Sequence, residues 1–277
     1  HAMGEDAKIT RRKVGHRRFL VRIAILGSCI LALTVAVLIP VLTSPYVDSR
    51  GQPPCQFKLK QIMIGIYYYH EEFGVLPPPY SSTPDGKRLH SWRTLILPYL
   101  NQQGFYDRLR LNEPWDSPHN HDVEAQFGDE VKRLFQCPSH PNKGETTWDD
   151  TCYLAIVGQQ TAWQVDNSIS FRDVKDGTTN TLAVVEVSNS ETHWMEPYDV
   201  DFRQMFPKVD LVRGSRVSSY HGGDGWGVPN GGSFVGTVAG AVRFLPEPLP
   251  DNLLEQLVTI DDGLPVDGWG DRLDRSR

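Results

Sequence analysis

Four acidic residues in the second half of the chain have the side chains that acid–base chemistry requires: Glu186, Glu196, Asp199 and Asp201. Two suitably spaced carboxylates can act as general acid and base, as in glycoside hydrolysis. Glu186, however, stands inside the apolar run LAVVEV, where a carboxylate must be paired or hydrogen-bonded. We therefore expect Glu186 to have a structural partner, either Arg93 or a backbone turn, and we predict no catalytic role for this group.

A glycine-rich stretch at residues 221–225, HGGDG, could cradle a phosphate or present His221 as a base. A phosphate-binding loop of the P-loop kind needs a preceding strand, a following helix and a Lys-Ser/Thr pair, and the stretch has none of these signals. We interpret it as a hairpin connection with a structural histidine. The chain also lacks a Gly-x-Ser-x-Gly elbow, and Cys137 and Cys152 lack a local protease signature. No catalytic residue is predicted.

The C-terminal stretch IDDGLPVDGWGD could supply oxygen ligands to calcium. Calcium takes six to eight oxygens, commonly carboxylates and carbonyls of a turning loop, but an EF-hand would need a Glu at its twelfth position. A solvated acidic terminus is the alternative interpretation, and no other cofactor is predicted. The candidate ligands are Asp261, Asp262, Asp267 and Asp271.

Seven tryptophans could form a platform for a glycan, because aromatic faces stack on sugar rings. Three lie beside charged residues and are expected to pack in the interior: Trp92, Trp115 and Trp194. Four lie in loop-like sequence and are freer to contact a ligand: Trp148, Trp163, Trp226 and Trp269.

Residues 23–42 carry no charge and could anchor the rest of the chain in a membrane. Twenty residues of helix span about 30 Å, the thickness of the bilayer's hydrocarbon core. Seven bases precede the segment, so we expect the N-terminus in the cytoplasm and residues 43–277 outside. A cleaved signal peptide is the alternative, although its apolar stretch is usually shorter. The residues before Met3 are interpreted as a remnant of cloning.

Charge excludes one class of partner. The whole chain has 28 bases and 34 acids, and residues 1–22 hold seven and two of them, so the remainder is strongly acidic. A nucleic-acid-binding protein needs a basic face, and we therefore predict no nucleic-acid partner.

Hydrophobic periodicity predicts helices first and strands later, which favours an α+β fold with helices packed on an antiparallel sheet. We divide the chain into a basic cytoplasmic segment (1–22), a transmembrane helix (23–42), a linker (43–54) and a globular head (55–277). Within the head, an amphipathic helix ends near Gly74, and a second helical region at 90–110 is broken near Pro98. Further helices are predicted at 123–135 and 252–259, and strands at 152–158, 181–187, 233–240 and 241–247.

Several stretches together resemble a large bacterial family of prepilin-like proteins, abundant in planctomycetes and known as domain of unknown function 1559. They are CQFKLKQIMIGIYYYHEEFG, HSWRTLILPYL, NEPWDSPHN, FQCPS, DVKDGTTNTLAVVEV, WMEPYD and GAVRFL. The resemblance implies an N-terminal membrane helix and a head similar to those of type IV pilins and type II secretion pseudopilins. It also implies a structural or interaction protein of the cell envelope. Residues 267–270, DGWG, are similar to a stretch of pseudopilins that bind calcium.

Membership of such a family implies a place in the cytoplasmic membrane, with the head in the periplasm and other envelope or pilin-like proteins as partners. The chain departs from the family's prepilin signal, because residues 15–19 read GHRRF and no acid occurs between Asp6 and Asp48. We therefore expect monomers or small complexes in place of long filaments. An anchored glycan-binding module is the alternative function, and a hydrolytic enzyme is a third.

Disulfide pairing follows from the same resemblance. Cys55 and Cys137 both fall in the family-like motifs, which implies that they pair. Cys137 with Cys152 is the close-range alternative, and Cys29 lies within the predicted membrane segment.

Overall fold

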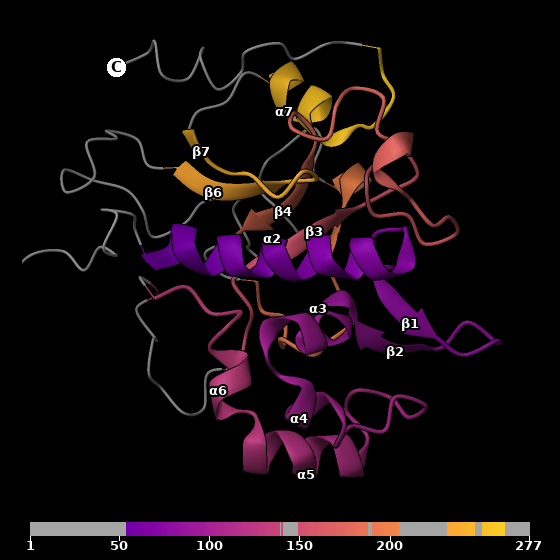
Figure 1. The fold of residues 1–277 in the computed structure, drawn as a ribbon, viewed down its shortest axis with the longest axis vertical. Helices are drawn as coiled ribbons and strands as arrows, with labels where there is room; N and C mark the ends of the chain where they lie inside the picture. The colour runs from indigo at the N-terminus through magenta and orange to yellow at the C-terminus, as the bar shows by residue number, and fades with distance from the viewer. Residues whose placement is uncertain are drawn as a thin grey trace, which may run out of the picture. The chain divides into compact units, whose positions relative to one another are not determined.

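The computed structural model describes residues 54–138, 140, 149–187, 190–204, 232–246 and 251–263 (Figure 1). All of them belong to one compact unit that begins at Asp48. The predicted segments 1–22 and 23–42 and nearly all of the linker lie outside the described residues and stay predictions. Among the described helices, none is both long and apolar enough to cross a bilayer.

Helix α2 (Pro54–Phe73) is the longest element of the described chain and confirms the first predicted helix. Its apolar residues at spacings of three and four bury one face, which comprises Cys55, Leu59, Ile62, Met63 and Ile66. The helix ends where Gly74 takes a left-handed conformation (φ 74°) and its N–H donates to the carbonyl of His70 at 2.8 Å. Glycine is the usual residue at this cap because it has no Cβ to clash.

The main sheet has five strands in the order β5-β3-β4-β6-β7. Strands β3, β4, β6 and β7 pair antiparallel, as predicted, but β5 runs parallel to β3, so the sheet is mixed. The prediction of a wholly antiparallel sheet was wrong because the chain leaves β4, crosses to the far side of β3 and adds β5 there instead of forming a hairpin. The strands are β3 (Tyr153–Val157), β4 (Leu182–Glu186), β5 (Val200–Asp201), β6 (Gly232–Thr237) and β7 (Val242–Pro246).

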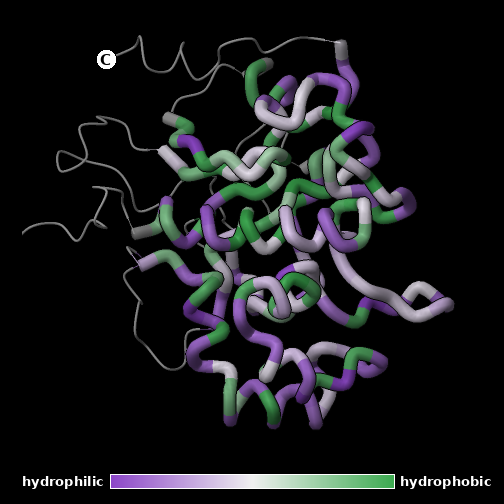
Figure 2. The backbone as a smooth tube through the Cα atoms, viewed as in Figure 1, coloured by the Kyte–Doolittle hydropathy of each residue, from purple (hydrophilic) through white to green (hydrophobic). Residues whose placement is uncertain are grey.

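Helices cover both faces of this sheet. Leu154, Ile156 and Val185 pack with Leu254 and Leu257 of α7 (Asp251–Val258) in one hydrophobic cluster, while Tyr153 and Ala155 join the larger cluster that contains α2. This explains why every residue of β4 is buried. Apolar residues accordingly line the strands and one side of α2 in Figure 2. At Gly236 of β6 a Cβ would collide with the side chain of Met63, so glycine lets α2 lie close to the strand.

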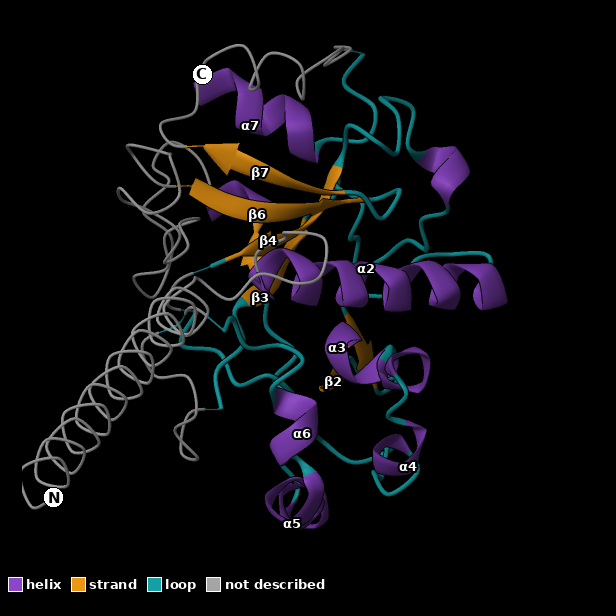
Figure 3. Ribbon diagram, turned by 60° about the vertical axis from the view of Figure 1, so that its left-hand side comes forward, coloured by secondary structure: helices purple, strands orange, loops and turns teal. Residues whose placement is uncertain are grey.

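Short elements lie on the side of α2 opposite β6 and β7, where α3, α4, α5 and α6 gather (Figures 1 and 3). The predicted helical region at 90–110 is here replaced by the end of a hairpin and three single turns, because Pro98 and left-handed Asn101 interrupt it. The helix predicted at 123–135 instead begins at Pro118, capped by the Ser117 hydroxyl, and is broken after Phe127. These elements are β1 (Tyr80–Ser82), β2 (Arg88–Ser91), α3 (Trp92–Leu95), η1 (Leu97–Leu100), α4 (Gln103–Tyr106), α5 (Pro118–Phe127) and α6 (Asp129–Lys132).

Candidate functional site

A fully buried arginine organises the centre of the head. Arg93 lies in α3, whose first turn is capped by the Ser91 hydroxyl accepting from the Arg93 N–H. Its guanidinium has five N–H bonds, and each of them has an acceptor. Nε donates to the Trp194 carbonyl (2.9 Å), and the two terminal nitrogens donate to Asp199 Oδ1 (2.8 Å) and to the carbonyls of Tyr153 (3.2 Å), Glu196 (2.9 Å) and Tyr198 (2.9 Å).

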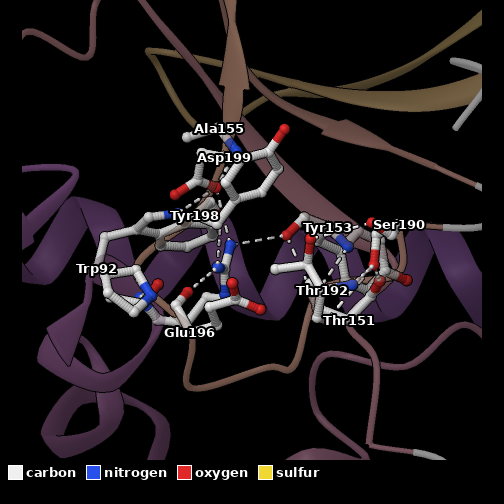
Figure 4. A network of polar contacts seen from close by, with 12 residues as sticks. Trp92, Thr151, Tyr153, Ala155, Ser190, Thr192, Glu196, Tyr198 and Asp199 are labelled. Atoms are coloured by element: carbon white, nitrogen blue, oxygen red, sulfur yellow. Dashed lines mark hydrogen bonds and ion pairs between the residues drawn. The ribbon is translucent and has the colours of Figure 1, made fainter. Parts of the chain in front are cut away.

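Asp199 completes this arginine network. Its Oδ1 also accepts from Trp92 Nε1 (3.0 Å) and from the backbone N–H of Ala155 (2.8 Å), so α3, the 194–199 segment and β3 meet at one oxygen (Figure 4). The side chains of Arg93 and Asp199 are 0% and 2% exposed. Burial raises the pKa of Asp199, and the positive charge of Arg93 and the hydrogen bonds oppose that shift.

The arginine network is a structural device, because all the donors of Arg93 are used within the chain. Of the four carboxylate residues considered for acid–base chemistry, Glu196 takes part in the network through its backbone carbonyl, and the other three have different contacts. Asp199 pairs with Arg93, and exposed Asp201 accepts from the N–H of Arg203. One expectation was that Glu186 pairs with Arg93, and this was wrong. Glu186 instead accepts a hydrogen bond from the backbone N–H of Phe234 at 3.2 Å.

A disulfide joins Cys55, in the first turn of α2, to Cys137, which follows α6. The loop that it closes has a sequence separation of 82 residues, for which the chain-entropy model gives a stabilisation of about 4–5 kcal/mol. Both sulfurs and a carboxylate oxygen of Glu186 lie within 4.8 Å of one another. Two thiolates and a carboxylate could bind zinc, but the disulfide occupies both sulfurs.

The third described cysteine, Cys152, is a free and buried thiol. Burial raises its pKa, with a smaller contribution from Glu186. Because the thiolate is the reactive form, this thiol is inert at neutral pH. Of the two pairings considered from the sequence, the structure thus contains Cys55–Cys137.

A second group of titratable residues lies beside the arginine network and consists of a lysine, a histidine and two acids. Lys132 Nζ contacts Asp149 Oδ1 at 2.8 Å, and His193 Nε2 lies 3.8 Å from Glu124 Oε1. The ring of His193 stacks on Trp115 with centroids 4.7 Å apart. We call the four titratable residues the His193 cluster.

The electrostatics of the His193 cluster follow from partial burial. Burial lowers the pKa of His193 to about 4, so the ring is neutral at pH 7, and burial raises the pKa of Glu124. His193 Nδ1 accepts from the Met195 N–H at 3.2 Å, which leaves the ring proton on Nε2, facing Glu124. For Lys132, burial lowers the pKa, but hydrogen bonds to Asp149 and Asp129 outweigh it and raise the pKa overall.

The His193 cluster was missed by sequence reasoning. A neutral histidine and a carboxylate with a raised pKa are components of acid–base catalysis. Glu124 lies in α5 and His193 follows β4, so no local spacing connects them. The one sequence signal for this cluster is that His193 directly precedes Trp194, which was expected to pack in the interior.

The tryptophans divide differently from the prediction. Trp163 was expected to be free to bind a ligand but is 1% exposed, and its Nε1 donates to the Ala183 carbonyl at 2.7 Å. This expectation was wrong because the turn after β3 folds Trp163 back onto Trp92, with ring centroids 5.2 Å apart. Trp92 and Trp194 are buried, as expected. Trp148, Trp226 and Trp269 lie outside the described residues.

The candidate calcium ligands are only partly described. Asp261 and Asp262 are exposed, and Asp262 Oδ2 accepts from the Thr259 hydroxyl at 2.7 Å. The backbone N–H of Asp262 donates to Asp176 at 2.9 Å, so this turn is held by hydrogen bonds within the chain. Asp267, Asp271 and the glycine-rich stretch at 221–225 lie outside the described residues, and the calcium site stays a prediction.

Comparison with known families gives one match. The model of the family described as "Protein of unknown function (DUF1559)" matches residues 53–250. The chain belongs to this family. No curated protein and no solved structure is significantly similar to the chain. Family membership therefore covers nearly all of the described head, including the arginine network and the His193 cluster.

Proposed function

We propose that this protein is a membrane-anchored, pilin- or pseudopilin-like structural or interaction protein of the cell envelope. In this proposal residues 23–42 span the cytoplasmic membrane with the N-terminus inside, the head lies in the periplasm, and other envelope or pilin-like proteins of a secretion or surface-assembly apparatus are its partners. The protein acts by contact and not by turnover.

The observation that carries the proposal is the arrangement of α2. It is a 20-residue helix at the start of the described head, with one face buried and with contacts to β6 and β7 of the sheet. A long helix that precedes the strands and packs on them resembles the design of pilin heads. The opposite face of α2 exposes large apolar side chains, which is typical of an interaction surface. The uncharged segment and its basic flank support the anchor.

Topology can be tested in intact cells. Protease added to spheroplasts should digest the head and leave a small stub in the membrane. A head released into the soluble fraction by processing near Thr43 would contradict the anchor. Capture from crosslinked membranes should recover other envelope proteins, and long homopolymeric filaments of purified protein would contradict the expectation of small complexes.

Two specific observations support other functions. Exposed Tyr67, Tyr68 and Phe73 on α2 favour an anchored glycan-binding module, since aromatic rings stack on sugars. Retention on an immobilised envelope polysaccharide, lost in Tyr68→Ala, would favour it. The His193 cluster is where a hydrolytic activity would have its acid and base. Reproducible hydrolysis of a glycan or peptide that His193→Ala abolishes would favour an enzyme over a contact protein.

A further inference from the structure

The outer face of α2 has a regular pattern of exposed apolar and charged residues. Phe57, Lys60, Ile64, Tyr67 and Glu71 are exposed and follow one another at spacings of three and four. They lie opposite the face that is buried against the sheet. The exposed fractions of Phe57, Ile64 and Tyr67 are 44%, 45% and 41%, and Tyr68 beside them reaches 54%. A helix that covers a sheet usually has a polar outer face, whereas this one repeats like the seam of a coiled coil.

The charges of this outer seam are arranged symmetrically. Lys60 lies near its N-terminal end and Glu71 near its C-terminal end, equally far in sequence from the point midway between Ile64 and Tyr67. A two-fold axis through that point would bring Lys60 opposite the partner's Glu71 and Ile64 opposite the partner's Tyr67. A parallel pair would instead place like charges together. The seam is therefore complementary to itself only in the antiparallel direction.

We propose that a second copy of this chain binds antiparallel along the outer face of α2. An isologous dimer requires one surface to match itself after a two-fold rotation, and the reversed charges at the two ends supply that match. Within the described residues Lys60 forms no ion pair, so it is available to the partner's Glu71. Gly74, which has open space around the position of a Cβ, comes opposite the partner's Phe57 and leaves room for its ring.

The dimer is weak and closed. A standard protein interface buries about 800 Å² on each partner, and one helical seam buries far less. The dissociation constant of the dimer therefore falls in the micromolar to millimolar range. A two-fold pair uses its surface completely and does not propagate into a filament. This inference rests on the proposed contact function and names a partner for it.

Crosslinking of the full chain in detergent micelles tests the geometry. Lys60→Cys and Glu71→Cys are introduced singly into differently tagged copies, which are mixed and mildly oxidised. Mixed Lys60→Cys/Glu71→Cys dimers should dominate over dimers of either variant with itself, and wild-type protein, with its native cysteines, should give none. Crosslinks mainly between identical variants, or no crosslinks at all, would overturn the proposal.

Charge reversal gives a second, independent measurement by sedimentation of the same full-length protein. Lys60→Glu or Glu71→Lys alone should weaken association by about tenfold, because each creates two like-charge contacts. The double variant should restore it, while Lys87→Glu, on the exposed β1–β2 turn, should have no effect. A double variant as weak as the singles would contradict the pairing. If dimerisation fails while crosslinked membranes still yield other envelope proteins, only the dimer is wrong and the contact function stands.

Discussion

The arginine network and the His193 cluster lie side by side in the same head but differ in how their ionisable side chains are buried and hydrogen-bonded. In the arginine network, a cation and an anion are almost fully buried, and each N–H bond of Arg93 has an acceptor. In the His193 cluster, the histidine is neutral, the pKa of Glu124 is raised, and Asp149 is 34% exposed. The first region surrounds a buried ion pair with hydrogen bonds, whereas the second disfavours the charged forms of His193 and Glu124.

The arginine network therefore stabilises the fold, whereas the residues of the His193 cluster can still change their protonation or their contact with water. Removing one partner of a matched buried pair leaves the other charge without solvation, which is strongly destabilising. A partly exposed group can recruit water, so its loss is better tolerated. It can also change protonation within an accessible pH range. The two regions should therefore respond very differently to substitution and to pH.

The largest effect is expected from Arg93→Ala. It leaves the Asp199 carboxylate buried without its cation and removes one donor from each of four carbonyl oxygens, so we expect a loss of about 3–5 kcal/mol in the free energy of unfolding. Urea unfolding followed by tryptophan fluorescence measures it. Arg93→Lys should recover only part of the loss, because one ammonium cannot reproduce the planar set of five donors. A loss below about 1 kcal/mol would contradict the distinction between the two regions.

Acid should destabilise the protein through His193. Its pKa is lowered in the folded state, so between pH 6.5 and about 4 the unfolded chain binds more protons than the folded one, and stability falls as the pH falls. The loss attributable to this ring amounts to about 3 kcal/mol at most. The raised pKa values of Glu124 and Asp199 act in the opposite direction.

His193→Gln isolates the histidine's contribution. Urea unfolding of wild type and variant at a series of pH values should give two curves that converge as the pH falls from 6.5 to 4. Parallel curves over that range would show that the imidazole is not buried in its neutral form.

A smaller effect is expected from Glu124→Gln. The amide oxygen can still accept from Trp194 Nε1, while the partly buried charge is removed. Because burial raises the pKa of Glu124, its ionised form is disfavoured at pH 7, and the variant should be more stable there by about 1 kcal/mol. The gain should disappear in acid, where Glu124 is protonated. Calorimetry at the two pH values checks this, with exposed Glu130→Gln as the matched control.

The smallest effect is expected from Lys132→Met. Lys132 pairs with Asp129 and Asp149, which are 68% and 34% exposed and keep water when the ammonium is removed. The cost should be about 1 kcal/mol or less and should shrink with added salt. Unfolding in low and high salt measures it. A cost equal to that of Arg93→Ala would place both regions in the same class.

Local pattern determined a large part of the fold. The spacing of apolar residues predicted an amphipathic helix that ends near Gly74, and α2 is that helix, with Leu59, Ile62 and Met63 buried. Four of the five strands of the main sheet follow from short apolar runs bounded by turn residues. These features are predictable because helix and strand periods depend on residues that are neighbours in sequence.

Only the tertiary structure decided the rest. The acceptors of Arg93 come from β3 and from the 194–199 segment, so no spacing in the sequence shows that Asp199, and not Glu186, is its partner. Trp163 stands in loop-like sequence but lies in the hydrophobic core, because a turn brings its ring against Trp92. Burial and pairing depend on groups that are distant in the chain, and such contacts exist only once the chain has closed around them.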